Sequence, residues 1–336
     1  SAHQDHNSLL RIARQFNCKT LCLTGISDKA LQGQLRIGNP EFKLYFGEDE
    51  LLQLLQNEDY DLGLNAITGS AGLRSSEAIL LRGKDLALAN KESMVMAGHI
   101  LAPLSQKMRK PILPVDSEHS AIFQAIGKHP AHELKKLIIT ASGGAFRDLP
   151  LNEFGSITPE AALKHPNWSM GAKVTLDSAT MFNKALEVIE AHWLFGLPYQ
   201  QITALMHPQS VIHSLVEFID GSLLAQLSHP DMRLPILYAL SYPHRYQSDI
   251  VQTSLLDLPP LSFRELEPER YPLFFLGLEV AKEGGLLPTV MNAANEAALK
   301  LFLEHRISFL EISSVIRSAV ENFQNEIDPS LQKIIH

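Results

Sequence analysis

The stretch EDELLQLLQNEDYDLGLNAIT, from Glu48 to Thr68, decides the fold class of this chain. Its first part spaces leucines three and four residues apart among polar side chains, which predicts an amphipathic helix. Its second part, from Leu62 onward, is a short apolar run that predicts a buried strand. A helix followed directly by a buried strand is the repeating unit of α/β folds.

The same alternation continues on both sides of this stretch. Helices are predicted at 7–16 and 75–83, and strands at 19–24, 85–90 and 112–116. This pattern predicts a Rossmann-like, doubly wound domain on a parallel sheet. Ligands of such sheets lie beyond the carboxyl ends of the strands. The strand exits here are TGSAGL (68–73), ANKES (89–93) and VDSEH (115–119).

The beginning of the printed sequence lacks one expected feature. A dinucleotide-binding domain normally opens with a strand and a glycine-rich turn whose amides contact the pyrophosphate. This sequence opens with SAHQDHNSLL, which has the pattern of the end of a second strand. We therefore expect either that the natural protein is longer or that this domain is an incomplete cofactor site.

The rest of the chain predicts further domains. A central α+β domain contains the strand and Ser-Gly-Gly turn LKKLIITASGG (134–144), a loop and strand running into a long helix (163–196), and a β-hairpin around Asp220-Gly221. Proline-dotted residues then predict a linker, and three helical patterns predict a C-terminal bundle. The predicted boundaries are 1–115 for the partial cofactor domain, 116–240 for the catalytic domain, 241–270 for the linker and 271–336 for the bundle.

Composition excludes several classes of protein. The 336 residues are 45% hydrophobic and 20% charged, with a net charge of −8, which argues against nucleic acid or an anionic membrane as a partner. No apolar run approaches the roughly 18 residues of a membrane span, and no signal peptide opens the sequence. Cys18 and Cys22 are expected to be reduced, packed thiols rather than a zinc site. A soluble, cytoplasmic protein is expected.

One predicted helix collects polar groups on a single face. Ser178 is a candidate N-cap, and Asn183, Lys184 and Glu187 follow at helical spacing within two turns. Hydroxyl, amide and ammonium donors at the positive end of a helix suit a phosphate group. The alternative is an ordinary N-cap beside a solvated Lys-Glu pair. Ser142, in the turn after a strand, is a second candidate donor, although a plain tight turn explains it equally well.

A second group of residues suggests a metal. Asp116 and Glu118 point the same way if their segment is extended, and a lone D-x-E pair is common. Glu187 is the candidate third carboxylate, and all-oxygen ligation suits Mg²⁺ or Mn²⁺, with Co²⁺ also considered. A loop at about 160–172 contains His165 and Trp168 without any periodicity. It predicts either a lid over a ligand or a packed loop.

Together these residues resemble a known enzyme family. The motifs ANKESMVMAG, PVDSEHSAIFQ, TASGGAFRD, HPNWSMGAKVTLDSATMFNKALEVIEAHWLFG, HPQSVIHS, LAQLSHPDMRLPI and NAANE are similar to those of 1-deoxy-D-xylulose 5-phosphate reductoisomerases. The resemblance extends from the first residues nearly to the end of the chain. It implies an NADPH- and divalent-metal-dependent enzyme of the non-mevalonate isoprenoid pathway that forms a homodimer.

The resemblance also implies a role for individual residues. The implied metal ligands, which are also implied to be catalytic, are Asp116, Glu118 and Glu187, and of these Glu118 and Glu187 also contact substrate. The implied phosphate-binding groups are Ser142, Ser178, Asn183 and Lys184. Further implied substrate contacts are Lys91, Ser117, His165 and Trp168, with Lys91 also a catalytic candidate. Residues implied to lie near the cofactor are Asn90, Glu92, Met170 and Gly171, and those implied to hold the adenosine 2′-phosphate are Ala2, His3 and Gln4.

The implied reaction converts a hydroxyketone phosphate by carbon–carbon bond cleavage and re-formation. The branched aldehyde that results is reduced by NADPH to 2-C-methyl-D-erythritol 4-phosphate. Two rival functions stay open at this point. One is a metal-dependent aldolase or isomerase of sugar phosphates without redox chemistry. The other is a non-catalytic module in which the carboxylates hold a structural ion.

Overall fold

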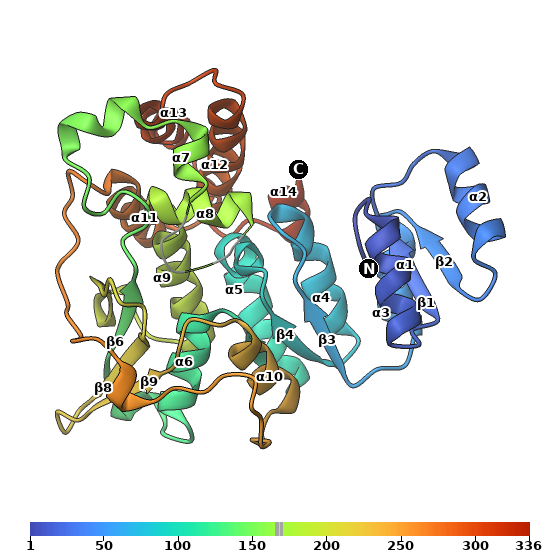
Figure 1. The fold of residues 1–336 in the computed structure, drawn as a ribbon, viewed down its shortest axis with the longest axis horizontal. Helices are drawn as coiled ribbons and strands as arrows, with labels where there is room; N and C mark the ends of the chain where they lie inside the picture. The colour runs from blue at the N-terminus through green and yellow to red at the C-terminus, as the bar shows by residue number, and fades with distance from the viewer. Residues whose placement is uncertain (165–167, 169–170) are drawn as a thin grey trace.

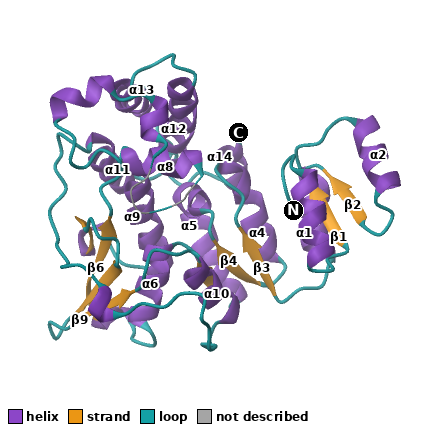
Figure 2. Cartoon of the chain, viewed as in Figure 1, coloured by secondary structure: helices purple, strands orange, loops and turns teal. Residues whose placement is uncertain are grey.

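The helix–strand alternation of the first third forms two parallel sheets. The computed structural model describes residues 1–164, 168 and 171–336. Figures 1 and 2 show the two sheets side by side, with helices packed against them. The first sheet pairs β1 (Thr20–Leu23) with β2 (Lys43–Phe46), and the second has the order β3 (Leu62–Asn65), β4 (Asp85–Leu88), β5 (Ile112–Pro114). The accompanying helices are α1 (His6–Gln15), α2 (Lys29–Gly38), α3 (Glu48–Asn57), α4 (Leu73–Leu81) and α5 (Lys91–Met108).

The first sheet belongs to a small N-terminal unit with its own core. Leu10 and Leu35, on two helices, pack against Leu21, Leu23 and Phe46 of the strands. This unit stands apart from the main body at one side of the molecule (Figure 1). The predicted doubly wound α/β class is confirmed, and the sheet is divided between this unit and the main body.

A mixed four-stranded sheet lies at the centre of the chain. Its order is β7 (Ile202–Met206), β6 (Leu134–Ala141), β8 (Ile212–Phe218), β9 (Leu223–Leu227), with β6 and β7 parallel and the other pairs antiparallel. The hairpin predicted at Asp220-Gly221 is confirmed as the β8–β9 connection. The helix α6 (Ser117–Ile126) packs on β8 and β9, while α9 (Phe182–Phe195) packs on β7 and on α5.

One element prediction was wrong. The strand expected before the long helix is a separate helix, α8 (Ala172–Ala179). Its hydroxyl groups find acceptors within the helix, because Thr175 Oγ1 and Ser178 Oγ donate to the carbonyls four residues earlier. A pair between Lys173 and Asp177, also four apart, adds support of a helical kind. The chain then turns at Met181, whose φ of 60° separates α8 from α9.

The C-terminal part is helical, as predicted. The helices are α11 (Pro272–Glu283), α12 (Leu287–Leu303), α13 (Phe309–Glu321) and α14 (Leu331–Ile335), and shorter elements before them are α7 (Pro159–Ala162) and α10 (Arg233–Ser241). A shared core joins α9, α11, α12 and α13. The last helix, α14, packs on α5 through Ile334 rather than on the bundle. Among the described helices, none has the length and apolarity needed to cross a bilayer.

Candidate active site

Asp116 stands where a parallel strand meets a helix. The strand β5 ends at Pro114, and the Asp116 carboxylate caps α6 by accepting from the backbone N–H of Glu118 at 3.0 Å and of His119 at 3.4 Å. Glu118 therefore lies in the first helical turn. The extended segment that we expected here from the sequence was wrong. The start of a helix offers free backbone N–H groups to the Asp116 carboxylate, whereas an extended strand does not.

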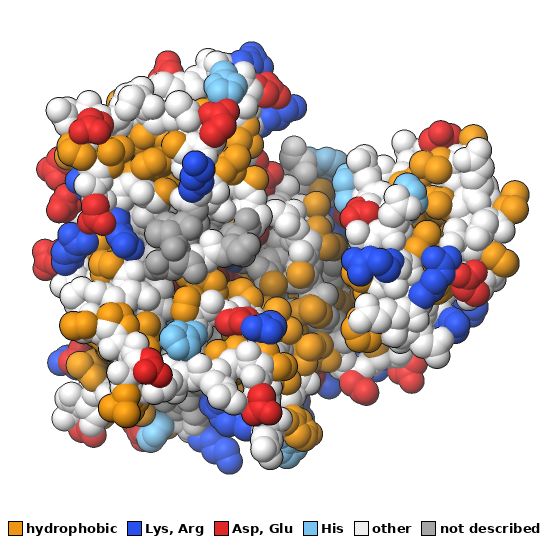
Figure 3. Space-filling view, viewed as in Figure 1, with side chains coloured by type: hydrophobic (Ala, Val, Ile, Leu, Met, Phe, Trp, Pro, Cys, Tyr) orange, Lys and Arg blue, Asp and Glu red, His pale blue; other side chains and the backbone are white. Residues whose placement is uncertain are grey.

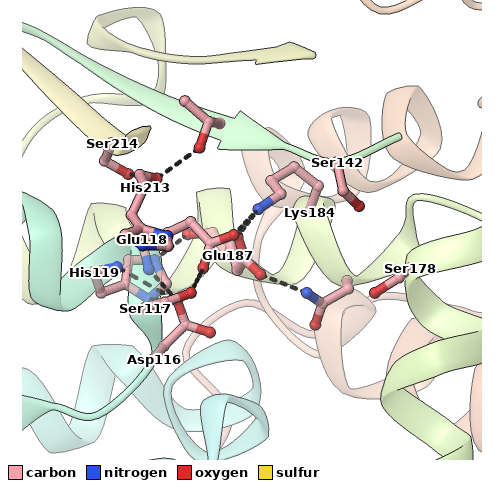
Figure 4. A network of polar contacts seen from close by, with 12 residues as sticks. Asp116, Ser117, Glu118, His119, Ser142, Ser178, Lys184, Glu187, His213 and Ser214 are labelled. Atoms are coloured by element: carbon pink, nitrogen blue, oxygen red, sulfur yellow. Dashed lines mark hydrogen bonds and ion pairs between the residues drawn. The ribbon is translucent and has the colours of Figure 1, made fainter. Parts of the chain in front are cut away.

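The three predicted carboxylates converge in space. Glu187 is fully buried on α9, and one oxygen each of Asp116, Glu118 and Glu187 lie within 4.8 Å of one another. Figure 4 shows the three side chains pointing toward one another from α6 and α9. Glu187 is far from Asp116 and Glu118 in the sequence. The packing of α9 beside α6 brings the three carboxylates together.

Two lysines neutralise most of this charge. Lys91 Nζ, at the start of α5, lies 2.8 Å from Asp116 Oδ2 and 3.0 Å from Glu187 Oε1. It also donates to Asn183 Oδ1 at 2.9 Å. Lys184 Nζ donates to Glu118 Oε1 at 2.7 Å and also pairs with Glu187. Three carboxylates thus face two ammonium groups, which leaves the cluster short of positive charge.

The pKa values reflect this crowding. Burial, followed by the nearby Glu118 charge, raises the pKa of Glu187 to about 7. Burial also acts to raise the pKa of Asp116, but Lys91 and His119 outweigh it and hold that pKa well below its usual range. His119, which we did not predict, lies beneath the site with its Nδ1 3.1 Å from Glu190 Oε2. Although burial opposes its charge, Glu190 and Asp116 raise the pKa of His119 to about 9.

A cavity of about 270 Å³ opens over the carboxylates. Ser142, Ser178 and Asn183 line it together with both lysines. Figure 4 shows Ser142 and Ser178 on the side of Lys184, away from Asp116. Ser178 is not the N-cap that we predicted, because it lies inside α8 and donates to Val174 O at 2.8 Å.

The turn after β6 brings Ser142 to this cavity. Gly144, at φ +71°, packs so tightly against α8 that a Cβ there would lie 2.5 Å from Ser178 O. Only a glycine allows this approach, and the approach sets the two serines on one wall. The Ser-Gly-Gly turn therefore has a positional role that its sequence pattern did not reveal.

Sequence reasoning missed part of the wall. Ser210 and His213, from the segment before and within β8, line the cavity, as does Met232. His213 Nε2 contacts Ser228 Oγ at 2.9 Å, and burial lowers the pKa of this imidazole. The Trp168 ring lies 5.9 Å from the His213 ring, centroid to centroid. The motif HPQSVIHS was a usable signal, since it places two histidines and two serines around one strand start.

The residues expected to hold the cofactor lie in a different place. Ala2 and His3 line a second cavity of about 750 Å³, whose opposite wall includes Leu64 and Thr68 at the end of β3. Figure 3 shows the molecule hollowed between the N-terminal unit and the main body. Gln4 lies beside it and donates to Gly25 O at 3.3 Å.

Two other residues expected near the cofactor, Asn90 and Glu92, line a hollow between the two cavities. Asn90 caps α5 and Glu92 is buried in the first turn of that helix, whereas the exposed Gly171 precedes α8. Ser117 lines the carboxylate cavity and donates to Glu118. The remaining predicted residues, His165 and Met170, lie outside the described part of the chain.

Known proteins share this sequence over most of its length. Models of 1-deoxy-D-xylulose 5-phosphate reductoisomerase match residues 1–98, and models of its C-terminal domains match 112–195 and 227–336. The 1-deoxy-D-xylulose 5-phosphate reductoisomerase of Halalkalibacterium halodurans is 50% identical over 86% of this chain and 76% of its own. That of Bacillus cereus is 44% identical over 100% of this chain and 88% of its own. The chain belongs to the 1-deoxy-D-xylulose 5-phosphate reductoisomerase family.

Solved structures of reductoisomerases have the same fold. One, described as a DOX-P reductoisomerase in complex with NADPH, fosmidomycin and magnesium, has a TM-score of 0.90 and 37% identity, covering 96% of this chain and 81% of its own. The Zymomonas mobilis reductoisomerase in complex with NADPH also has a TM-score of 0.90, at 38% identity, covering 99% of this chain and 86% of its own. The resemblance inferred from the motifs is thereby confirmed.

Proposed function

We propose that this chain catalyses the NADPH- and divalent-metal-dependent isomerisation and reduction of 1-deoxy-D-xylulose 5-phosphate to 2-C-methyl-D-erythritol 4-phosphate, a step in isoprenoid precursor biosynthesis. The observation that carries the proposal is the convergence of Asp116, Glu118 and Glu187 in one cavity of a reductoisomerase-family chain. The conversion adds one hydride from NADPH and one proton to the substrate. This conversion fits the two cavities, because one is lined by carboxylate and ammonium groups and the other is larger.

The carboxylate cluster fits a divalent cation. Its donors are hard oxygens, which suit Mg²⁺ or Mn²⁺, and Co²⁺ more weakly. Burial raises the pKa of Glu187 and the neighbouring Glu118 charge adds to the rise, and a bound cation would offset both effects. Asp116, Glu118 and Glu187 would hold the ion, which when bound supplies a Lewis acid to substrate oxygens. The solved relative described with magnesium supports this assignment.

The chain's own donors suit a phosphorylated sugar. Ser142, Ser178 and Asn183 stand on the cavity wall beside Lys184, where they would bind the phosphate group. Lys184 is held by Glu118 and Glu187 in this structure, so its ammonium group must turn from them to contact a phosphate. Lys91, at the opposite end, would orient substrate oxygens or move a proton. Trp168 and Gly171 belong to the predicted lid at about 160–172, which would exclude water.

The second cavity is the proposed place for NADPH. Ala2, His3 and Gln4 lie at its N-terminal wall, where they would contact the adenosine end of the cofactor. Asn90 and Glu92 stand on the path between this cavity and the carboxylates. When bound, the cofactor supplies the hydride for the aldehyde. The solved relatives described with NADPH support this placement.

We also propose a homodimer located in the cytoplasm. The strand β8 is paired on both edges, whereas β9 is one of the two edge strands of the central sheet. Leu223 and Leu224 of β9 are exposed, and a second copy would cover them. Two free cysteines suit a reducing compartment.

The direct test is an NADPH-oxidation assay on the full-length protein with 1-deoxy-D-xylulose 5-phosphate. We expect loss of NADPH absorbance only when Mg²⁺ or Mn²⁺ is present, and formation of the branched polyol phosphate in equal amount. Turnover of the substrate without NADPH consumption would favour a sugar-phosphate aldolase or isomerase. Absence of any turnover would favour a binding module.

A further inference from the structure

We propose that Asn295 and Glu296, neighbours on α12, are positioning residues that close a ring of hydrogen bonds along one wall of the passage between the two cavities. The ring runs from α12 to α8, from α8 to α5, from α5 to the loop after β3, and back to α12. It links the C-terminal bundle to both sides of the reaction site. The proposal rests on the proposed function for its catalytic consequence, but the ring itself has a test that does not.

The first link joins α12 to α8. Asn295 Nδ2 donates to Asp177 Oδ1 at 2.7 Å, and both residues are almost fully buried. The other amide atom, Asn295 Oδ1, is buried with no hydrogen-bond partner among the described residues. An unsatisfied buried acceptor costs free energy, so an asparagine at this point is better explained by Asp177 than by core packing. Burial raises the pKa of Asp177 despite this bond and its lysine partner.

The second link joins α8 to α5. Lys173 Nζ lies 2.8 Å from Asp177 Oδ2 on its own helix and 3.0 Å from Glu92 Oε1 on α5. Its side chain is 18% exposed, whereas those of Asp177 and Glu92 are 2% and 8% exposed. A single ammonium group therefore joins two buried carboxylates on different helices. Because Lys173 is in the first turn of α8, this pair fixes the start of that helix.

The third link joins α5 to the loop after β3. Asn90 Nδ2 contacts Glu92 Oε2 at 3.1 Å and donates to Ile67 O at 2.6 Å and Gly69 O at 2.8 Å. Gly72 leaves the space for this amide, since a Cβ there would lie 2.5 Å from Asn90. The predicted cofactor residues Asn90 and Glu92 therefore act on the backbone of this loop in the structure.

The last link returns from the loop to α12. Glu296 Oε1 accepts from the backbone N–H of Ser70 at 3.3 Å and from Asn292 Nδ2 at 3.1 Å. Gly69, at φ +75°, allows this approach because a Cβ there would lie 2.8 Å from Glu296 Oε1. The motifs TGSAG and NAANE therefore contact each other. A glycine in the first motif leaves the room that a side chain of the second occupies.

The ring forms one wall of the connection between the two cavities. Four of its residues, Asn90, Glu92, Lys173 and Asp177, line a hollow of about 80 Å³ together with Thr68, Lys91 and Asn183. The loop after β3 also lines the proposed cofactor cavity, and α8 bears Ser178 of the substrate cavity. A closed ring holds these two walls at a fixed separation, which a hydride transfer between two bound molecules requires.

A double-mutant cycle tests the ring, because breaking a second link should add no further loss once the first link is broken. We expect Lys173→Met and Asn295→Ala each to lower kcat/KM about 3- to 30-fold, and the double variant to lose no more than the worse single one. Lys173→Arg, which keeps the cation, should retain most activity. Asn325→Ala is the matched control, since Asn325 bonds Leu286 N and Gly284 O outside the ring. Its effect should multiply with that of Lys173→Met.

Losses that multiply in the Lys173→Met, Asn295→Ala double variant would overturn the ring, as would single variants with full activity. A test independent of catalysis is amide hydrogen exchange at Ser70. Among the described residues Lys173 pairs with Glu92 and Asp177 and not with Ser70, yet we expect Lys173→Met to speed exchange there as Asn295→Ala does. Unchanged exchange at Ser70 in Lys173→Met would overturn the proposal. If the wild-type protein has no reductoisomerase activity, the proposed function fails and the exchange experiment still decides on the ring.

Discussion

Lys184 shows how one side chain in this site can have two kinds of anionic partner. Its ammonium group is buried and bonded to Glu118 and Glu187, yet it adjoins the wall of Ser142 and Ser178 where a phosphate would bind. A buried ammonium group needs anionic partners on every accessible side. Carboxylates supply them in this structure, and a substrate phosphate is the proposed further partner.

We expect Lys184→Ala to raise the KM for the sugar phosphate by roughly tenfold or more, because a charge-assisted hydrogen bond contributes about 1.5–3 kcal/mol. The KM for NADPH should change much less, since the second cavity does not include Lys184. Steady-state kinetics with saturating magnesium would measure both constants. Equal increases in the two would count against a phosphate contact.

The two cysteines are expected to differ in reactivity. Cys22 is 2% exposed, and burial raises its thiol pKa to about 11, whereas Cys18 is exposed. Since the thiolate is the reactive form, iodoacetamide at pH 8 should label Cys18 and spare Cys22 in the native protein. Peptide mass spectrometry would show this, with labelling of both in urea as the control. Equal native labelling rates would contradict the packing of β1.

At the level of single residues, the sequence was most informative where chemistry limits the choice. Asp116 and Glu118 were predictable because carboxylates after a buried strand need a partner, and Glu187 was a candidate because Asn183 and Lys184 share its helix face. Their ligand role remains a prediction. Ser210 and His213 were missed because one serine and one histidine near a strand have many ordinary explanations. The partners of Asn90 and Glu92 were also invisible, since they lie on α8 and in the β3 loop.

Among the secondary-structure elements, helix packing depends on two closely approaching backbones. Gly277 of α11 lies against α9, and a Cβ there would be 2.4 Å from Ala185 Cβ. Gly33 of α2 is also inside a helix, but nothing lies within 4 Å of its Cβ position. The same substitution should therefore have opposite effects at the two positions.

We expect Gly277→Ala to lower stability by about 1–3 kcal/mol through overpacking. Gly33→Ala should instead raise it by up to about 1 kcal/mol, because alanine favours the helix. Thermal unfolding followed by circular dichroism would compare the two. A Gly277→Ala variant as stable as the wild type would show that α11 and α9 are not in the close contact described here.

Periodic elements were predictable and the irregular junction was not. The amphipathic helix before β3 and the hairpin of β8 and β9 follow from spacing alone. The segment VTLDS alternates like a strand, so α8 was missed. As a helix it gives its hydroxyl groups acceptors on its own backbone, and it buries Asp177 where Lys173 and Asn295 both bond to it. Such partners from α12 cannot be read from local pattern.

For the whole molecule, the exposed leucines of the β9 edge strand make the homodimer testable. We expect sedimentation equilibrium to give twice the chain mass, and Leu223→Lys on β9 to shift the protein toward monomer. Leu81→Lys on α4 is the matched control, because both leucines are 55% exposed. A wild-type monomer, or dimers unaffected by Leu223→Lys, would remove β9 as the interface.

The most direct test of the account is the activity of Glu187→Gln as a function of magnesium. Glutamine keeps the shape of the side chain but removes the negative charge that the proposed cation needs. We predict that kcat falls by about 10³-fold at any magnesium concentration, since a Lewis acid contributes several kcal/mol, while circular dichroism shows an intact fold. The exposed Glu279→Gln should behave as the wild type. Full magnesium-dependent activity in Glu187→Gln would contradict the central claim that three converging carboxylates hold the catalytic ion.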